Sequence, residues 1–162
     1  QLPLAARIEL TQPFAARAGL LRTPEAEEKL AKVVEGADDR LKMAGDILDF
    51  DYFFIDEFTF NDKAFNKRIC KPQNARPLLL ALRGHLAQVD FSTADQLEHE
   101  IGQFCANMEI ELKDIIHAIR VATTGQAGGF GMFDTLFILG KDRVLGRIDA
   151  ALERAATICT DS

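Results

Sequence analysis

The segment IELKDIIHAIRV, residues 110–121, shows the pattern that decides the fold class. Its apolar residues recur at spacings of three and four, which places them on one face of a helix: Leu112, Ile115, Ile116 and Ile119. The preceding segment, 97–108, has the same spacing. Two successive segments with helical periodicity indicate a helical protein.

Other segments carry the start and stop signals of helices. Thr23-Pro24 before EAEEKLAKVVEG is a cap with a first-turn proline, and Ser92 or Thr93 is expected to cap the helix over 97–108. Pro72 or Pro77 is expected to open a helix over LLLALRGHLAQV, and a last helix is predicted from Lys141 to about Thr157. The sequence therefore predicts an all-α fold. The core is predicted to contain Leu112, Ile115, Ile119, Leu136, Leu139, Val144 and Ile148.

Charge is distributed unevenly along the 162 residues, whose net charge is −6. The segment 63–83, called here the basic segment, has 6 basic residues and no acidic one. Such a segment can attract a polyanion although the protein as a whole is acidic. The alternative is a solvated helix face. The candidates for contacts with an RNA backbone are Lys63, Lys67, Arg68, Lys71 and Arg76.

Cysteines and histidines give no sign of a metal centre. The three cysteines are far apart, and their odd number suggests reduced thiols: Cys70, Cys105 and Cys159. The histidines fall in different predicted helices without metal-ligand spacing: His85, His99 and His117. Nothing resembles a catalytic carboxylate pair, and Gly140-Lys141 lacks the Ser or Thr of a nucleotide P-loop. We expect neither a metal site nor a catalytic residue in this sequence.

Two arginines are candidates for a functional or a structural role. Arg120 ends an apolar helical run just before a glycine-rich loop, and Arg40 follows two acidic residues. A guanidinium can bind a base edge or a phosphate through its planar set of donors. The alternatives are a buried salt bridge for Arg120 and an ion pair with Asp38 or Asp39 for Arg40. The apolar loop residues Phe130, Met132 and Phe133 could belong to the core or offer a stacking surface.

The order of these motifs resembles a known family, the C-terminal anticodon-binding region of bacterial-type glutamyl-tRNA synthetase. The similarity begins at PFAARAGL (13–20) and continues through DDRLKMAGDILDFDYFF (38–54) and NDKAFNKR (61–68). It is most specific in IRVATTG (119–125) with MFDTLFILGKDRVLGRI (132–148). Four matching segments occur in the same order and are spread over nearly the whole chain.

This resemblance implies a helical anticodon-binding domain of the class I synthetase type, with two helical subdomains. The irregular segment 51–62, rich in acidic and aromatic residues, places their boundary near residue 57, which gives subdomains over 1–57 and 58–162. Arg40 is then expected near the third anticodon base. Arg120 is expected near the first and second bases, together with loop residues Gly129, Phe130 and Met132. Splayed bases, hydrogen bonds and stacking are the usual means of reading single-stranded RNA.

The resemblance also implies a partner and a parent enzyme. The partner is the anticodon loop of the glutamate tRNA, and the parent is a cytoplasmic, monomeric glutamate–tRNA ligase that uses ATP and magnesium. The ATP-binding signatures of that family are absent from these residues, so we expect recognition of tRNA without its aminoacylation, no cofactor in this segment and no membrane contact. The alternatives are a helical protein-interaction module and a synthetase-like paralogue that charges no tRNA.

Overall fold

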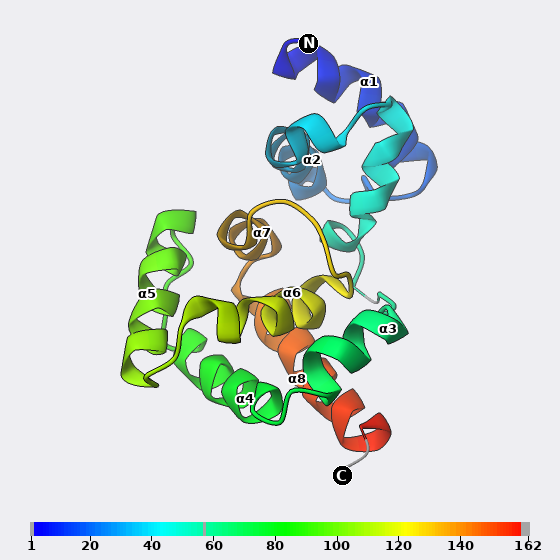
Figure 1. Ribbon diagram of the computed structural model, residues 1–162. Coiled ribbons are helices and arrows are strands. Elements are labelled where there is room, and N and C mark those ends of the chain that lie inside the picture. The colour runs from blue at the N-terminus through cyan, green and yellow to red at the C-terminus, as the bar shows by residue number, and fades with distance from the viewer. Residues whose placement is uncertain (1, 57, 160–162) are drawn as a thin grey trace. The chain divides into compact units, whose positions relative to one another are not determined.

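The computed structural model describes residues 2–56 and 58–159, and these residues are helical without a strand (Figure 1). The predicted all-α fold is therefore confirmed. The chain forms two compact units, of which unit 1 ends at Phe58 and unit 2 begins at Thr59. The boundary predicted at residue 57 lies outside the described residues. None of the helices in the described part is long and apolar enough to cross a membrane.

Unit 1 packs two α-helices against 3₁₀-helical turns. Helix α1 (Leu4–Arg17) contacts α2 (Pro24–Ala37) and the 3₁₀ segment η2 (Ala44–Phe53), and the short η1 (Asp38–Arg40) follows α2. Pro24 occupies the start of α2 as predicted, where a proline removes no helical hydrogen bond. The core of unit 1 contains four fully buried residues: Leu30, Val33, Ile47 and Phe53.

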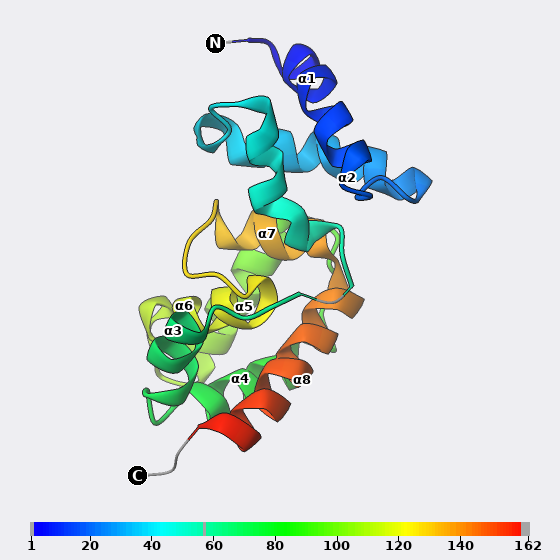
Figure 2. The ribbon, with the colours of Figure 1, turned by 90° about the vertical axis from the view of Figure 1, so that its right-hand side faces the viewer.

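Unit 2 contains the remaining helices. In chain order these are α3 (Asp62–Phe65), the π-helical turn η3 (Asn66–Cys70), α4 (Ala75–Leu86), α5 (Ala94–Asn107), η4 (Leu112–Asp114), α6 (Ile116–Thr124), α7 (Met132–Leu139) and α8 (Lys141–Ile158). Helix α8 lies beside α4 and contacts α6, and α5 packs against α7 (Figure 2). Thr93 caps α5, because its hydroxyl accepts a hydrogen bond from the Gln96 N–H at 3.0 Å. These contacts bury one continuous core.

Most of the predicted core is correct, and Leu112 is the exception. Ile115, Ile119, Leu136, Leu139, Val144 and Ile148 are buried, whereas Leu112 is only half-buried. The helix predicted through 110–121 is broken, because Leu112 lies in η4 and α6 begins only at Ile116. Asp114 stabilises this break by accepting a hydrogen bond from the Glu111 N–H at 2.9 Å. Helix α4 likewise begins at Ala75, between the two prolines expected to open it.

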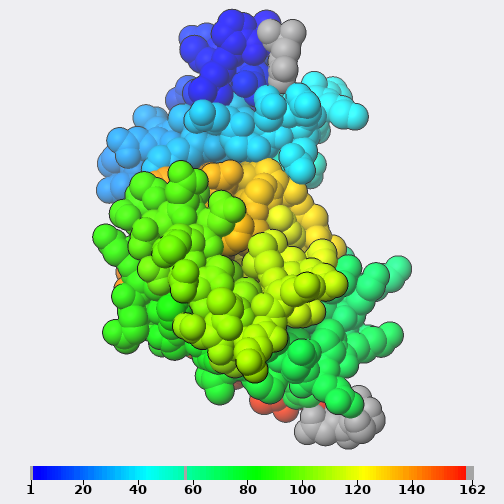
Figure 3. All heavy atoms as spheres, turned by 60° about the vertical axis from the view of Figure 1, so that its left-hand side comes forward, coloured from blue at the N-terminus to red at the C-terminus, as the bar shows by residue number. Residues whose placement is uncertain are grey.

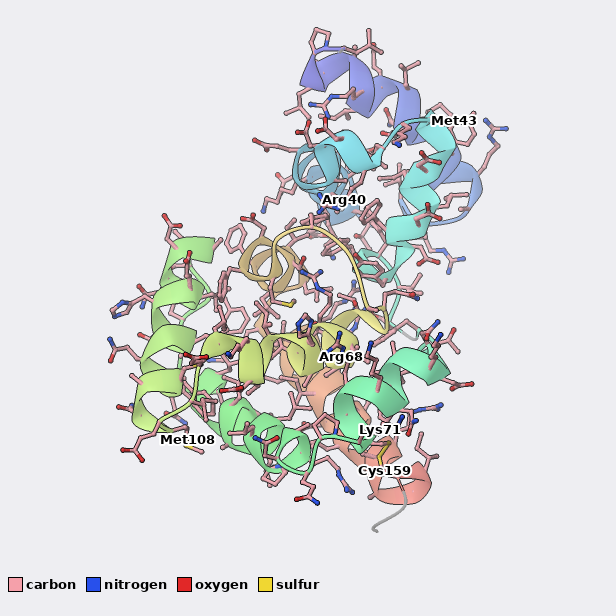
Figure 4. All side chains as sticks on the ribbon, viewed as in Figure 1. Arg40, Met43, Arg68, Lys71, Met108 and Cys159 are labelled. Atoms are coloured by element: carbon pink, nitrogen blue, oxygen red, sulfur yellow. A yellow bond between two sulfur atoms is a disulfide. The ribbon has the colours of Figure 1, made fainter. Side chains whose placement is uncertain are left out.

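The prediction of three reduced thiols is wrong for two of them. Cys70, at the end of η3, is joined by a disulfide to Cys159, the residue after α8, and their Cα atoms are 5.1 Å apart. Figure 4 shows Lys71 and Cys159 close together at this junction. Helix packing brings together residues separated by 89 positions, which the sequence spacing does not show. Cys105 remains a buried thiol.

Candidate nucleic-acid interface

The loop of residues 125–131 joins α6 to α7 and is anchored at its first residue. Gly125 adopts a left-handed conformation with φ of 76°, and its N–H donates to the Val121 carbonyl at 2.8 Å, which ends α6. The Gly125 carbonyl accepts a hydrogen bond from the Asn61 N–H, also at 2.8 Å. Asn61 in turn caps α3 through its side chain. The start of the loop is thereby fixed to the start of the basic segment.

Arg120 connects the two ends of this loop. Its side chain is half-buried, and Nη2 donates a hydrogen bond to the Phe130 carbonyl at 2.8 Å. The Thr124 hydroxyl lies 2.7 Å from the Arg120 carbonyl and accepts from the Gln126 N–H at 3.1 Å. A guanidinium carries five N–H donors, so the bond to Phe130 is compatible with a second partner. Arg120 thus holds the loop in shape at the position where the resemblance expects RNA.

Arg147 is a second arginine that stabilises this region, and it is missing from the predicted site. Its side chain is only 4% exposed, and Nη1 donates to the Thr123 carbonyl at 2.8 Å. The residue lies on α8 between Val144 and Ile148, which are both buried. An arginine within this apolar stripe was the sequence signal that could have identified Arg147, because an arginine is rarely buried without a partner. Arg147 connects α8 to the last turn of α6.

The side chains of Phe130 and Met132 belong to the core of unit 2. Each is 3% exposed, whereas Gly129 is half-buried. The Phe130 ring is therefore not accessible for base stacking in this conformation, and the core interpretation describes both side chains. A contact between RNA and the backbone of Gly129, Phe130 or Met132 remains a prediction.

Arg40 lies in unit 1, at the end of η1, with its side chain exposed. Asp38, one of the two acidic residues expected as its alternative partner, forms an ion pair with Arg7 at 3.3 Å. Asp38 also has φ of 42°, an uncommon conformation for a residue other than glycine. This turn places Arg40 on the surface beyond the end of α2.

The basic segment is spread over three elements of unit 2. Figure 3 shows that the surface of α3 and η3 borders that of α6. Lys63, Lys67 and Lys71 are exposed, whereas Arg68 and Arg76 are half-buried. Arg83, the last basic residue of the segment, pairs with Asp149 of α8 at 2.9 Å. That pair is structural, so the candidates for RNA contact lie on α3, η3 and the start of α4.

Comparison with known proteins adds the decisive observation. Residues 6–152 match the family described as "Anticodon binding domain". The chain belongs to this family. The resemblance found in the motifs is thereby confirmed over most of the chain.

Relatives of this anticodon-binding domain are glutamate–tRNA ligases. The enzyme of Roseiflexus sp. (strain RS-1) is 35% identical over 145 residues, which cover 86% of this chain and 28% of the relative. That of Desulforudis audaxviator (strain MP104C) is 31% identical over 157 residues, covering 93% of this chain and 31% of the relative. The chain therefore spans less than a third of the curated relatives it matches.

The fold of the anticodon-binding domain also matches solved structures. A glutamate tRNA ligase from Elizabethkingia meningosepticum superposes with a TM-score of 0.81 at 20% sequence identity, over 94% of this chain and 29% of that chain. A glutamate-tRNA synthetase from Elizabethkingia anophelis gives a TM-score of 0.78 at 21% identity. Identity this low supports the fold alone. The superposition agrees with the helical architecture built above.

Metal-ligating side chains do not gather in the described part of the domain. Within residues 2–56 and 58–159, no group of three or more such side chains could hold a metal ion. Nε2 of His85, on α4, lies 3.3 Å from the Glu100 carboxylate and 3.2 Å from the Glu100 carbonyl oxygen. These contacts give His85 a structural role.

Proposed function

We propose that this domain recognises the anticodon loop of the glutamate tRNA as part of a glutamate–tRNA ligase. The observation that carries the proposal is the family match over residues 6–152, together with relatives that are glutamate–tRNA ligases. The complete ligase would attach glutamate to its tRNA at the expense of ATP, with magnesium. We assign no residue of the described part of this chain to the binding of ATP or magnesium. We further propose a cytoplasmic, monomeric enzyme.

Both units contact the RNA in this proposal. Arg40 on unit 1 contacts the third anticodon base, and Arg120 with the loop of residues 125–131 contacts the first two. The exposed lysines of the basic segment bind phosphates, which fixes the position of the RNA without reading its sequence. Arg120 and the Asn61 N–H donate hydrogen bonds to the loop backbone, and the Thr124 hydroxyl accepts one from it. The loop is therefore shaped for base contacts before RNA binds.

Arg120 and Arg147 provide a matched pair of tests for the loop. Arg120→Ala is expected to weaken binding of an anticodon stem-loop about 10-fold or more, the cost of losing one charged hydrogen bond. Arg147→Met is expected to lower the free energy of unfolding by about 1–3 kcal/mol, since it leaves the Thr123 carbonyl buried without this donor. Fluorescence anisotropy measures the first effect and denaturant unfolding the second. If Arg120→Ala lowered the free energy of unfolding as much as Arg147→Met does, the role of Arg120 would be structural only.

Charge reversal in the basic segment tests the phosphate contacts. Lys67→Glu, alone and with Arg68→Glu, should weaken binding to all single-stranded RNAs alike. Each lost contact should also reduce the steepness of the slope of log affinity against log salt concentration by about 0.7. Lys113→Glu is the matched control, because Lys113 is an exposed lysine on η4 that pairs with Glu111. If Lys67→Glu behaved like this control, the basic segment would be only a solvated face.

A further inference from the structure

Three cations surround His117, which is exposed in the first turn of α6. Arg120 follows three residues later, on the same side of the helix. The π-helical turn η3 packs against α6 and supplies Lys67 and Arg68. Figure 4 shows Arg68 beside α6. We call Lys67, Arg68, His117 and Arg120 the His117 cluster.

The charges with the largest effect on His117 are positive. The pKa of His117 is lowered from its ordinary value. Partial desolvation of the ring is the largest cause, and the positive charges of Arg68, Arg120 and Lys67 follow. A histidine ordinarily titrates near about 6.5, so His117 is neutral at neutral pH. Cations placed this close repel one another, and an anion bound among them would relieve that repulsion. The electrostatics of the cluster therefore suit an anionic ligand.

Three acidic side chains on the other elements packed against α6 have partners of their own. Asp62 of α3 pairs with Arg154 at 2.7 Å, and Asp149 of α8 pairs with Arg83 of α4. Asp114 of η4 accepts its hydrogen bond from the backbone of its own turn. The charged groups that act most strongly on His117 are thus those of η3 and of α6 itself.

We propose that Lys67, Arg68 and His117 form a binding site for one backbone phosphate of the RNA, and that His117 takes up a proton when this phosphate binds. The inference rests on the proposed function and adds a residue and a pH dependence to it. His117 lies one turn before Arg120, so a phosphate bound here would belong to a nucleotide next to the bases that Arg120 contacts. His117 is a phosphate-binding residue in this account and does not read a base.

The direction of the pH dependence follows from linkage. In the free protein the pKa of His117 lies below its ordinary value, and a bound phosphate anion raises it. RNA binding is therefore accompanied by proton uptake as long as the pH lies between the free and the bound pKa. Affinity rises as the pH falls through the bound pKa and stops rising below the free pKa. Each pH unit between these two values corresponds to about a 10-fold change in affinity.

The test combines NMR with binding measurements from about pH 5.5 to 8, the range in which histidines titrate. An anticodon stem-loop is expected to raise the pKa of His117, and the control position is His99, an exposed histidine on α5. His117→Gln, which keeps a polar side chain, should bind with little dependence on pH, whereas the matched variant His99→Gln should behave like the wild type. Circular dichroism confirms that both variants are folded.

The outcomes separate this inference from the proposed function. RNA binding that leaves the pKa of His117 unchanged, or His117→Gln with the wild-type pH dependence, would overturn the phosphate site and leave anticodon binding intact. Inorganic phosphate serves as a separate probe, and a response of His117 to this ion but not to RNA would also overturn the inference. Failure of the wild type to bind the stem-loop at any pH would remove the proposed function and the site with it.

Discussion

Reduction of the Cys70–Cys159 disulfide should lower the free energy of unfolding by about 2–4 kcal/mol. The bond closes a loop whose ends are 89 positions apart, so it removes a large part of the conformational freedom of the unfolded chain. Denaturant unfolding of the oxidised and the reduced protein measures the difference. The double variant Cys70→Ser with Cys159→Ser should have the lower stability under both conditions.

Cys105 supplies the control for this experiment. Burial raises the pKa of its thiol, and the negative charge of Asp114 raises it further, so little reactive thiolate forms. Cys105→Ala should therefore keep the full response to a reductant. Three reactive thiols in the unfolded, unreduced protein, together with equal stability before and after reduction, would show that Cys70 and Cys159 are not bonded.

Arg40→Gln is expected to change the preference between tRNAs more than it changes affinity for the glutamate tRNA. The glutamate anticodon ends in cytosine, whose O2 and N3 acceptors suit the donor-only guanidinium. The glutamine anticodon ends in guanine, whose N1–H and N2–H would oppose the arginine donors. A matched bidentate contact corresponds to about 1–3 kcal/mol of discrimination, roughly 10- to 100-fold in relative affinity.

A glutamine at position 40 offers both a donor and an acceptor, so it should tolerate either base. The preference for the glutamate tRNA over the glutamine tRNA should therefore become smaller. Lys42→Gln is a suitable control, because Lys42 is also exposed and lies two residues further along the same turn. Binding titrations with the two stem-loops measure the preference in each variant. An unchanged preference in Arg40→Gln would remove Arg40 from the base-reading site.

Local sequence signals predicted the helices well because each depends on neighbouring residues. Thr23-Pro24 marks the start of α2, and Gly125 ends α6 in the left-handed conformation that glycine adopts without strain. Periodicity alone also placed Ile115 and Ile119 in the core. It failed at Leu112, because the hydrogen bond from the Glu111 N–H to Asp114 favours a separate 3₁₀ turn over a continuous helix.

Long-range contacts were beyond such signals. The disulfide depends on how α8 packs, and no spacing in the sequence brings Cys70 to Cys159. Arg147 meets Thr123 only because α8 crosses α6. The grouping of Lys67 and Arg68 with His117 likewise arises from the packing of η3 on α6. Family resemblance supplied Arg40 and Arg120 as candidates, and their contacts with RNA remain predictions.

A side-by-side titration of the wild-type domain tests the central claim most directly. One RNA is the anticodon stem-loop of the glutamate tRNA, and the other differs only in its third anticodon base, changed from cytosine to guanine. We expect salt-sensitive binding of both RNAs, with the cytosine form bound about 10- to 100-fold more tightly. Equal affinity for the two would contradict recognition of the glutamate anticodon, and absence of binding at low salt would contradict an RNA-binding role altogether.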